Sequence, residues 1–390
     1  MKQWWILGWV VLLVITQPVL AEEDITTEIL ESYTEFYGDV FEEQLEDAEA
    51  DDAFASLFAK EEPKEILSKL VQGKIDLSHS AIGKTIIQFF MGEVYQGIKL
   101  LIFIVILSVL CSYLTGLQEG FGAEGVGMVA FYACYIIIAG IASVAFYQTA
   151  ECAGDTVEQI ALFMKMVVPL VITTLVTCGA LVSATVLEPV LVTVVELSVA
   201  IIQGVMIPAV MIATGMNIVN HLSDRFKTQK LVKFMNQSIK WGMSVMLTVF
   251  VSVAGIQSIA SGGADALSVK LSKFATANLI PVVGGILAES VETVMNCSVL
   301  IKNSVGIFGI LCLVAMVVFP ILKIAAMLLL FRLTAAVCEP ISEPKIIGCI
   351  SEFANSISVL FSILTAVCVM FVMVLTIVIN AGNTALMLGR

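Results

Sequence analysis

Charged side chains are scarce in this 390-residue sequence. Only 14% of the residues are Asp, Glu, Lys or Arg, whereas 59% are hydrophobic and the mean hydropathy is +0.99. Soluble domains are about 25% charged, and a soluble chain this apolar would expose large hydrophobic patches. The apolar residues also form runs of about 20 or more, the length that crosses roughly 30 Å of hydrocarbon. The composition therefore predicts an all-α, polytopic transmembrane helical bundle.

Histidine is almost absent, and the cysteines are not paired in sequence. His79 and His221 are the two histidines, both in polar stretches, and none of the nine cysteines forms a CxxC motif. No Ser/His/Asp or Cys/His pattern is visible, so we expect no enzyme activity, no metal and no cofactor. Most cysteines fall within hydrophobic runs, where a free thiol acts as a small apolar group. Disulfide formation is an alternative for the cysteines near the ends of runs, which are Cys152, Cys297, Cys338 and Cys349.

The negative charge is confined to one stretch near the N-terminus. The net charge is −13, yet 16 acidic residues and a single basic one lie between Glu22 and Glu62. The rest of the chain is nearly neutral. Anionic lipid headgroups and nucleic acid would repel so acidic a stretch, and we expect no nucleic-acid partner.

The first 21 residues have the pattern of a signal peptide. Lys2 precedes an apolar region, and Val19-Leu20-Ala21 supplies a cleavage site before Glu22. An uncleaved anchor helix is the alternative. In either case residues 22–97 form an acidic, extracytoplasmic segment.

This acidic segment carries apolar residues at helical spacing, which predicts short amphipathic helices, one of them over 64–71. Their apolar stripes must be covered by the membrane domain or by a partner. Residues 82–95 are expected to lie along the membrane surface.

The membrane domain is expected to have two halves, 98–225 and 226–390. The tract 221–240 holds five basic residues and one acidic one, so it should be cytoplasmic. An odd number of crossings must then precede it, whereas four runs do, so 166–187 is expected to be re-entrant or only partly inserted. The number of spans stays between six and eight. The hydrophobic runs are 100–118, 125–150, 166–187, 190–218, 241–260, 303–337 and 354–380.

Two stretches of the chain resemble each other. Residues 139–145 and 254–260 share the pattern AGIxSxA, and an acid expected in a loop follows each, Asp155 and Asp265. Prolines then recur at a spacing of 39 residues in two pairs: Pro169 and Pro208, and Pro281 and Pro320. The recurrence suggests an internal duplication of the membrane domain.

If the duplication holds, 166–187 corresponds to 279–300, which is too polar for a comfortable lipid-facing span. Both are then expected to be re-entrant or half-length elements led by a proline and packed inside protein. Pro320 should break the long run 303–337. Duplicated halves with broken helices are typical of transporters and permease-like proteins.

Ionisable residues inside hydrophobic runs are the candidate functional groups, because charge is costly there. Glu196 is the best single candidate. Glu188 precedes Pro189 at an expected helix start, where its carboxylate would favour the helix dipole. Lys323 is expected to pair with Glu196 if the two repeats pack face to face.

Other candidates lie in the second half of the chain. Snorkelling to the interface is the alternative role for each basic residue there. Glu289 would line a polar face, and the glycines after Pro281 fit a tight bend or a close helix approach. These further candidates are Gly284, Gly285, Glu289, Lys302 and Arg332.

Two short motifs, together with the signal peptide and the acidic segment, carry a family resemblance. They are IPVVGG at 280–285 and SVLIKNSVG at 298–306. Over essentially its whole length, the chain resembles the stage III sporulation protein AE family of endospore-forming bacteria.

The resemblance implies a permease-like, multi-pass component of a mother cell–forespore channel or secretion complex, in the mother-cell membrane around the forespore. The implied partners, besides the lipid bilayer, are a secretion-type ATPase, ring-forming proteins, a forespore-side channel protein and a YidC-type insertase. From the residues alone, a stand-alone secondary transporter of a small solute or ion is the alternative. A purely structural membrane anchor is a third interpretation.

Overall fold

The structure, a computed structural model, describes residues 38, 63–71, 79–121, 124–222, 228–279 and 284–389. Every element within these ranges is helical, which confirms the all-α class. The expected signal peptide, most of the acidic segment and Pro281 lie outside them. The helices are α4 (Pro63–Val71), α5 (His79–Phe121), α6 (Glu124–Thr177), α7 (Leu181–Ile201), α8 (Ile207–Leu222), α9 (Gln229–Leu279), α10 (Gly284–Cys338) and α11 (Pro344–Gly389), with a π-helical turn, η1 (Ile202–Met206), between α7 and α8.

The helices are long enough to cross a membrane and to continue beyond it. α10 has 55 residues, which at 1.5 Å per residue makes a rod of about 80 Å, against roughly 30 Å of hydrocarbon. By length and apolar composition, the described residues contain five candidate spans, which supports the polytopic prediction. These spans are Gly83–Gly116, Met128–Thr177, Leu181–Leu222, Cys297–Cys338 and Pro344–Ala381.

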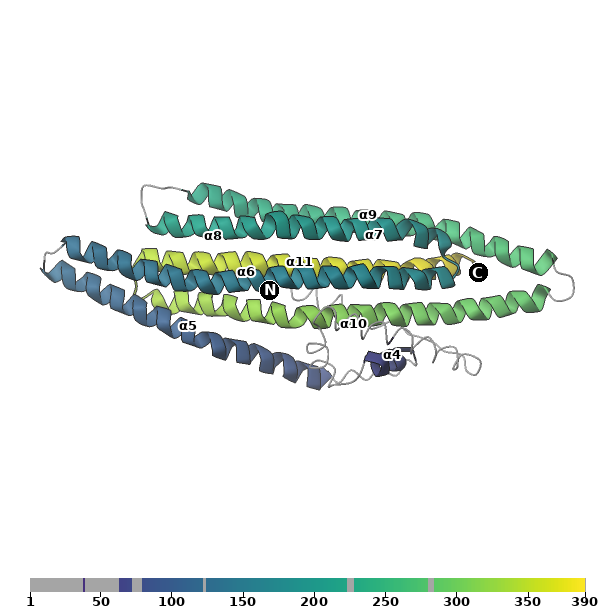
Figure 1. The fold of residues 1–390 in the computed structure, drawn as a ribbon, viewed down its shortest axis with the longest axis horizontal. Coiled ribbons are helices and arrows are strands. Elements are labelled where there is room, and N and C mark those ends of the chain that lie inside the picture. Colours follow the sequence, from purple (N-terminus) through teal and green to yellow (C-terminus); the bar gives the residue numbers. More distant parts are fainter. Residues whose placement is uncertain are drawn as a thin grey trace.

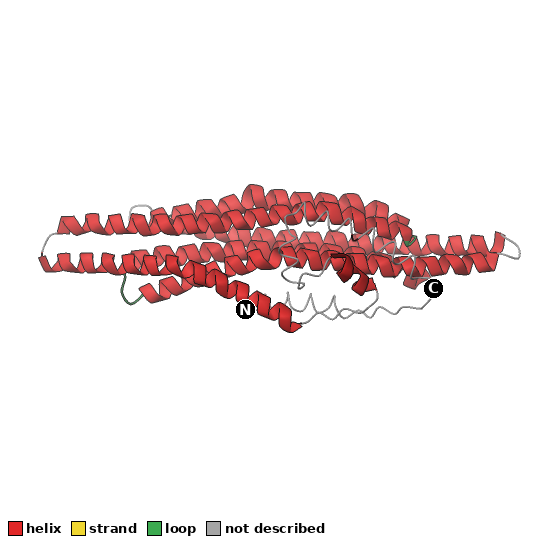
Figure 2. Ribbon diagram, turned by 60° about the horizontal axis from the view of Figure 1, so that its bottom comes forward, coloured by secondary structure: helices red, strands yellow, loops and turns green. Residues whose placement is uncertain are grey.

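Consecutive long helices run up and down the bundle (Figure 1). The junctions after α5, α8 and α10 lie at one end, on the left of Figure 1, and those after α6 and α9 lie at the other. The rods keep this side-by-side arrangement in the turned view of Figure 2. α11 contacts α6, α7, α8, α9 and α10, so it forms the centre of the bundle. Its Phe353 and Phe371 are almost fully buried, whereas most of α5 faces outward.

The first span and the segment before it form one helix. Residues 82–95, expected along the membrane surface, belong to α5 and continue directly into the span. Phe89 packs edge-on against Phe319 of α10, with ring centroids 4.6 Å apart. The segment is therefore a continuous part of α5 that packs against α10, and its position along the membrane surface stays a prediction. The expected domain boundary at 97/98 falls inside α5, whereas the boundary at 225/226 falls between α8 and α9.

The apolar residues of α4 are covered by the membrane domain. Ile66, Leu67 and Leu70 are buried, and α4 packs on α10. The short helix predicted over 64–71 is therefore present, and the membrane domain rather than a partner covers its stripe.

The run 166–187 is a hairpin rather than a single crossing. α6 ends at Thr177 and α7 starts at Leu181, with a tight turn between them. Gly179 adopts a φ of 77°, which glycine accepts without a steric penalty. The Ala180 N–H then donates to the Leu175 carbonyl at 3.0 Å. Three candidate spans therefore precede the basic tract, and the odd number of crossings needs no re-entrant element.

The two regions paired by the suggested duplication differ in structure. Pro169 lies inside α6, eight residues before its end, whereas Pro281 lies between α9 and α10. Residues 284–300 begin the full-length α10, so they are not a half-length element. The acids expected in loops, Asp155 and Asp265, lie inside α6 and α9.

The remaining prolines do not divide the helices as expected. α10 runs through Pro320 without a break, because neighbouring helices pack along it and hold the backbone where the N–H is missing. Pro208 follows the π turn η1, after which the Ile207 N–H donates to Ile202, five residues back. A π turn is a usual way to absorb the disturbed hydrogen bonding around an interior proline.

Candidate functional site: buried charges around the α6–α7 turn

A buried carboxylate from α9 caps the start of α7. Asp265 is fully buried; its two carboxylate oxygens accept hydrogen bonds from the Val182 N–H at 2.8 Å and the Ser183 N–H at 3.0 Å. The first turn of a helix has N–H groups without partners inside the helix and carries partial positive charge. The backbone of α7 thus compensates the buried charge, and α9 is tied to α7 at this level.

A buried ammonium from α10 lies near the same turn. Lys302 is fully buried, and its Nζ donates a hydrogen bond of 2.6 Å to the Ile379 carbonyl of α11. Snorkelling to the interface is therefore ruled out for this lysine. The contact ties α10 to α11, just as Asp265 ties α9 to α7.

Cys178, in the α6–α7 turn, lies within the electrostatic reach of Lys302. Burial raises the pKa of the Cys178 thiol to about 11, although the charge of Lys302 acts in the opposite direction. The thiol is therefore protonated at neutral pH. All nine cysteines of the chain fall within the described ranges and are free. The disulfide bond that the sequence left as an alternative is therefore not formed in this structure.

Glu196, the leading candidate from the sequence, lies at the surface. Its carboxylate forms an ion pair with Lys165 of α6 at 3.3 Å, and both side chains are about half exposed. The expected partner, Lys323, is exposed elsewhere on α10 and does not meet it. The pairing of Glu196 with Lys323 is therefore wrong, because α7 packs on α6 beside this carboxylate. An exposed pair of this kind contributes little to stability.

The other candidates are scattered. Glu188 is exposed and lies, with Pro189, inside α7 rather than at its start, so its capping role is wrong. The carboxylate of Asp265, from α9, caps the start of α7 instead. Arg332 is exposed near the end of α10. Gly284 and Gly285 open α10, and Glu289 follows within its first two turns.

A second set of polar contacts joins α6, α8 and α11 near the opposite end, and sequence reasoning missed it. The Asn217 amide donates to Glu352 at 3.0 Å, and the Tyr135 hydroxyl donates to the Ile218 carbonyl at 2.8 Å. A ring nitrogen of His221 lies 2.9 Å from the Asn217 carbonyl. Asn217 interrupts an apolar run and Glu352 lies just before one, which was the available indication in the sequence.

The arrangement positions helices. Asp265 and Lys302 each bond to backbone groups, and losing a partner would leave an uncompensated charge in a low-dielectric interior. Within the described part of the chain, no group of three or more metal-ligating side chains is present. The buried charges thus fix the relative positions of four helices where α6 turns into α7.

The long apolar helices and their buried charged contacts define a polytopic helical membrane protein. The family model for stage III sporulation protein AE matches residues 62–382, and the chain belongs to that family. It is therefore a sporulation protein as well as a multi-pass membrane protein. The stage III sporulation protein AE of Bacillus subtilis (strain 168) is 27% identical over 328 residues, which cover 84% of this chain and 82% of that protein. No solved structure matches the chain.

Proposed function

We propose that the protein is the permease-like, multi-pass component of a channel or secretion complex that joins mother cell and forespore. It acts in the mother-cell membrane around the forespore, with its N-terminal segment outside the cytoplasm. Membership of the sporulation family supports the setting. The extent of the bundle beyond the membrane supports a role in an assembly.

The length of the helices is the observation that carries the proposal. The bundle contains rods of about 80 Å, yet only about 30 Å of each fits within hydrocarbon. Asp265 meets the first turn of α7, and α9 continues for a further 14 residues, about 20 Å, to Leu279. The α9–α10 hairpin therefore extends past the α6–α7 turn, as Figure 1 shows on its right side. A hairpin that projects in this way offers partners a rigid surface.

Charge gives the proposed orientation. Three candidate spans lead from α5 to the basic tract after α8, which we place in the cytoplasm. The junctions after α5 and α10 share that end of the bundle. The α6–α7 turn, the α9–α10 hairpin and the C-terminus then face the space between the two membranes, as does the acidic N-terminal segment after signal-peptide cleavage.

The proposed partners are those that the family resemblance implies, and the orientation assigns them to the two ends of the bundle. Ring-forming proteins and a forespore-side channel protein would meet the extracytoplasmic end. A secretion-type ATPase would meet the basic, cytoplasmic end, and a YidC-type insertase would act beside the bundle. We propose no enzymatic activity for this chain.

Gene deletion in the source organism tests the proposal. We expect a block after engulfment, with heat-resistant spores restored by the wild-type gene. Tagged full-length protein, solubilised from sporulating cells, should retain the ATPase and the ring-forming proteins. Normal numbers of heat-resistant spores after deletion would refute the proposal.

A stand-alone secondary transporter is the second candidate function. The buried charges of Asp265 and Lys302 favour it, because such groups often mark transport pathways. In that case the purified protein alone, reconstituted in vesicles, should move a solute or an ion. The channel-complex proposal requires the other components for any transfer.

A further inference from the structure

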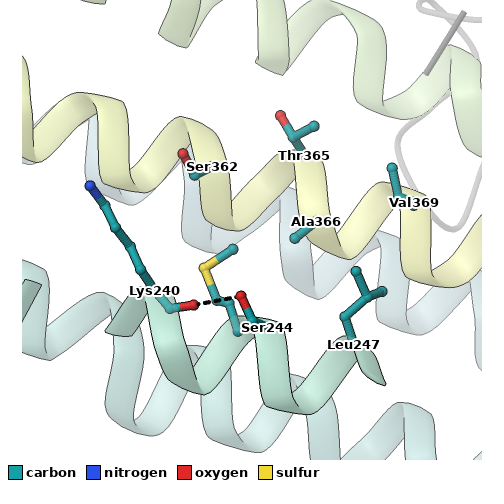
Figure 3. Close-up of a pocket in the computed structure, with 8 residues that line it drawn as sticks. Lys240, Ser244, Leu247, Ser362, Thr365, Ala366 and Val369 are labelled. Carbon is teal, nitrogen blue, oxygen red and sulfur yellow. Dashed lines mark hydrogen bonds between the residues drawn. The ribbon is translucent and has the colours of Figure 1, made fainter. Parts of the chain in front are cut away.

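A groove opens between α9 and α11, and the α11 residues that line it are partly exposed. Four residues from each helix line it at the same spacing, i, i+3, i+4 and i+7, and its volume is about 460 Å³. Small side chains along the contact, such as Ala366, leave part of the space between the two helices unfilled. The lining residues are Lys240, Met243, Ser244 and Leu247 of α9, and Ser362, Thr365, Ala366 and Val369 of α11 (Figure 3).

The three hydroxyl groups of the groove need no further partner. Ser244 donates to the Lys240 carbonyl at 3.1 Å, Ser362 to the Ser358 carbonyl at 2.8 Å and Thr365 to the Phe361 carbonyl at 2.8 Å. A buried polar group is costly only when it lacks a hydrogen bond. The groove can therefore accept a hydrocarbon chain without leaving these hydroxyls unsatisfied.

One end of the groove is positively charged. Lys240 lies there beside Ser362, while Leu247 and Val369 lie at the other end (Figure 3). Lys230 and Lys233 precede Lys240 on α9, and all three are exposed. In the described part of the chain, no carboxylate lies within ion-pair distance of Lys240.

The surroundings of the groove are those of a membrane interface. Trp241, beside Lys240, is 70% exposed, and Val245 and Val249 continue the exposed apolar surface of α9. Tryptophan is enriched at the level of lipid headgroups, and lysines between helices on the cytoplasmic side bind anionic headgroups. The groove thus has a cationic end at headgroup level and a neutral channel towards the membrane interior.

We propose that this groove binds one anionic phospholipid. The phosphate pairs with the Lys240 ammonium, and an acyl chain lies along Met243, Leu247, Ala366 and Val369. The lipid fills the gap between α9 and α11 and so fastens α9 to the central helix. The occupant is a lipid rather than a free phosphate, because most of the groove is apolar and supplies no second cation.

The test uses the purified full-length protein in neutral detergent micelles. Palmitoyl-oleoyl phosphatidylglycerol should raise the melting temperature by about 3 °C, whereas the phosphatidylcholine of the same chains and soluble glycerol phosphate should not. Lys240→Gln removes the charge and Ala366→Leu fills the groove, so each should abolish most of the rise in melting temperature. Lys230→Gln, which also removes an exposed lysine of α9 but does not line the groove, should keep it.

Lipid retained through purification gives an independent readout, which does not require the variants to be equally stable. Mass spectrometry of the wild-type protein and the Lys230→Gln variant should find phosphatidylglycerol at about one molecule per chain. Lys240→Gln and Ala366→Leu should retain several-fold less. An equal melting shift and equal retention in all four proteins, or no preference for the anionic lipid, would overturn the proposal.

Discussion

At the scale of single residues, buried charges matter more than exposed ones in this bundle. Asp265 and Lys302 are fully buried and bond to backbone groups, whereas Glu196 and Lys165 pair at the surface. A charge inside a low-dielectric core must keep its partners. Two exposed charges gain little by pairing, because water solvates each of them almost as well when they are apart. The two buried contacts, of Asp265 with α7 and of Lys302 with α11, therefore determine how these helices pack.

Replacement of Asp265 tests this difference. Asp265→Ala leaves the first N–H groups of α7 without their carboxylate and should lower the free energy of unfolding by about 2 kcal/mol. Thermal unfolding of the detergent-solubilised protein, followed by circular dichroism, measures the change. Glu188→Ala removes an exposed carboxylate from the same helix and serves as the control, with an expected effect below about 0.5 kcal/mol. Equal losses would contradict the capping role.

At the scale of helices, glycines decide how closely neighbouring rods approach. A methyl group added at Gly306 of α10 would collide with Ile379 of α11, and one added at Gly348 of α11 would come within 2.6 Å of the His221 ring of α8. At Gly215 of α8 the same methyl group would meet nothing within 4 Å. Close packing of α10, α11 and α8 thus depends on Gly306 and Gly348, while Gly215 has no such role.

These contacts predict opposite signs for the same substitution. Gly306→Ala should destabilise the protein by about 1–3 kcal/mol through overpacking. Gly215→Ala should stabilise it by up to about 1 kcal/mol, because alanine has the higher helix propensity. Thermal unfolding of both variants under the same conditions checks the pair. The close α10–α11 packing would be contradicted if Gly306→Ala were as stable as Gly215→Ala.

At the scale of the whole molecule, the order of helices predicts the topology. If six long rods cross, counting α7 with α8 as one, the basic tract and the C-terminus face opposite sides. Alkaline phosphatase, which is active only outside the cytoplasm, should be inactive when fused after Lys240 and active when fused at the C-terminus. A cytoplasmic reporter should give the reverse pattern. The six-crossing arrangement would be refuted if alkaline phosphatase were active in both fusions or inactive in both.

Composition and periodicity by themselves determined the class of the protein, because an excess of apolar residues in long runs admits few structures other than membrane helices. They also located the helix over 64–71 and placed Lys302 and Glu196 among the residues of interest. Sequence motifs such as IPVVGG and LIKNSVG were specific enough to indicate the family.

Only the tertiary structure decided which charges are buried, where the turns fall and which helix is central. The run 166–187 looks like one span, since its apolar pattern continues across the turn that Gly179 makes. Asp265 was noticed in the sequence as an expected loop acid, but its role depends on α7, more than 80 residues away along the chain. Such contacts arise when distant segments pack together, so hydrophobic periodicity, which reports only local geometry, does not contain them.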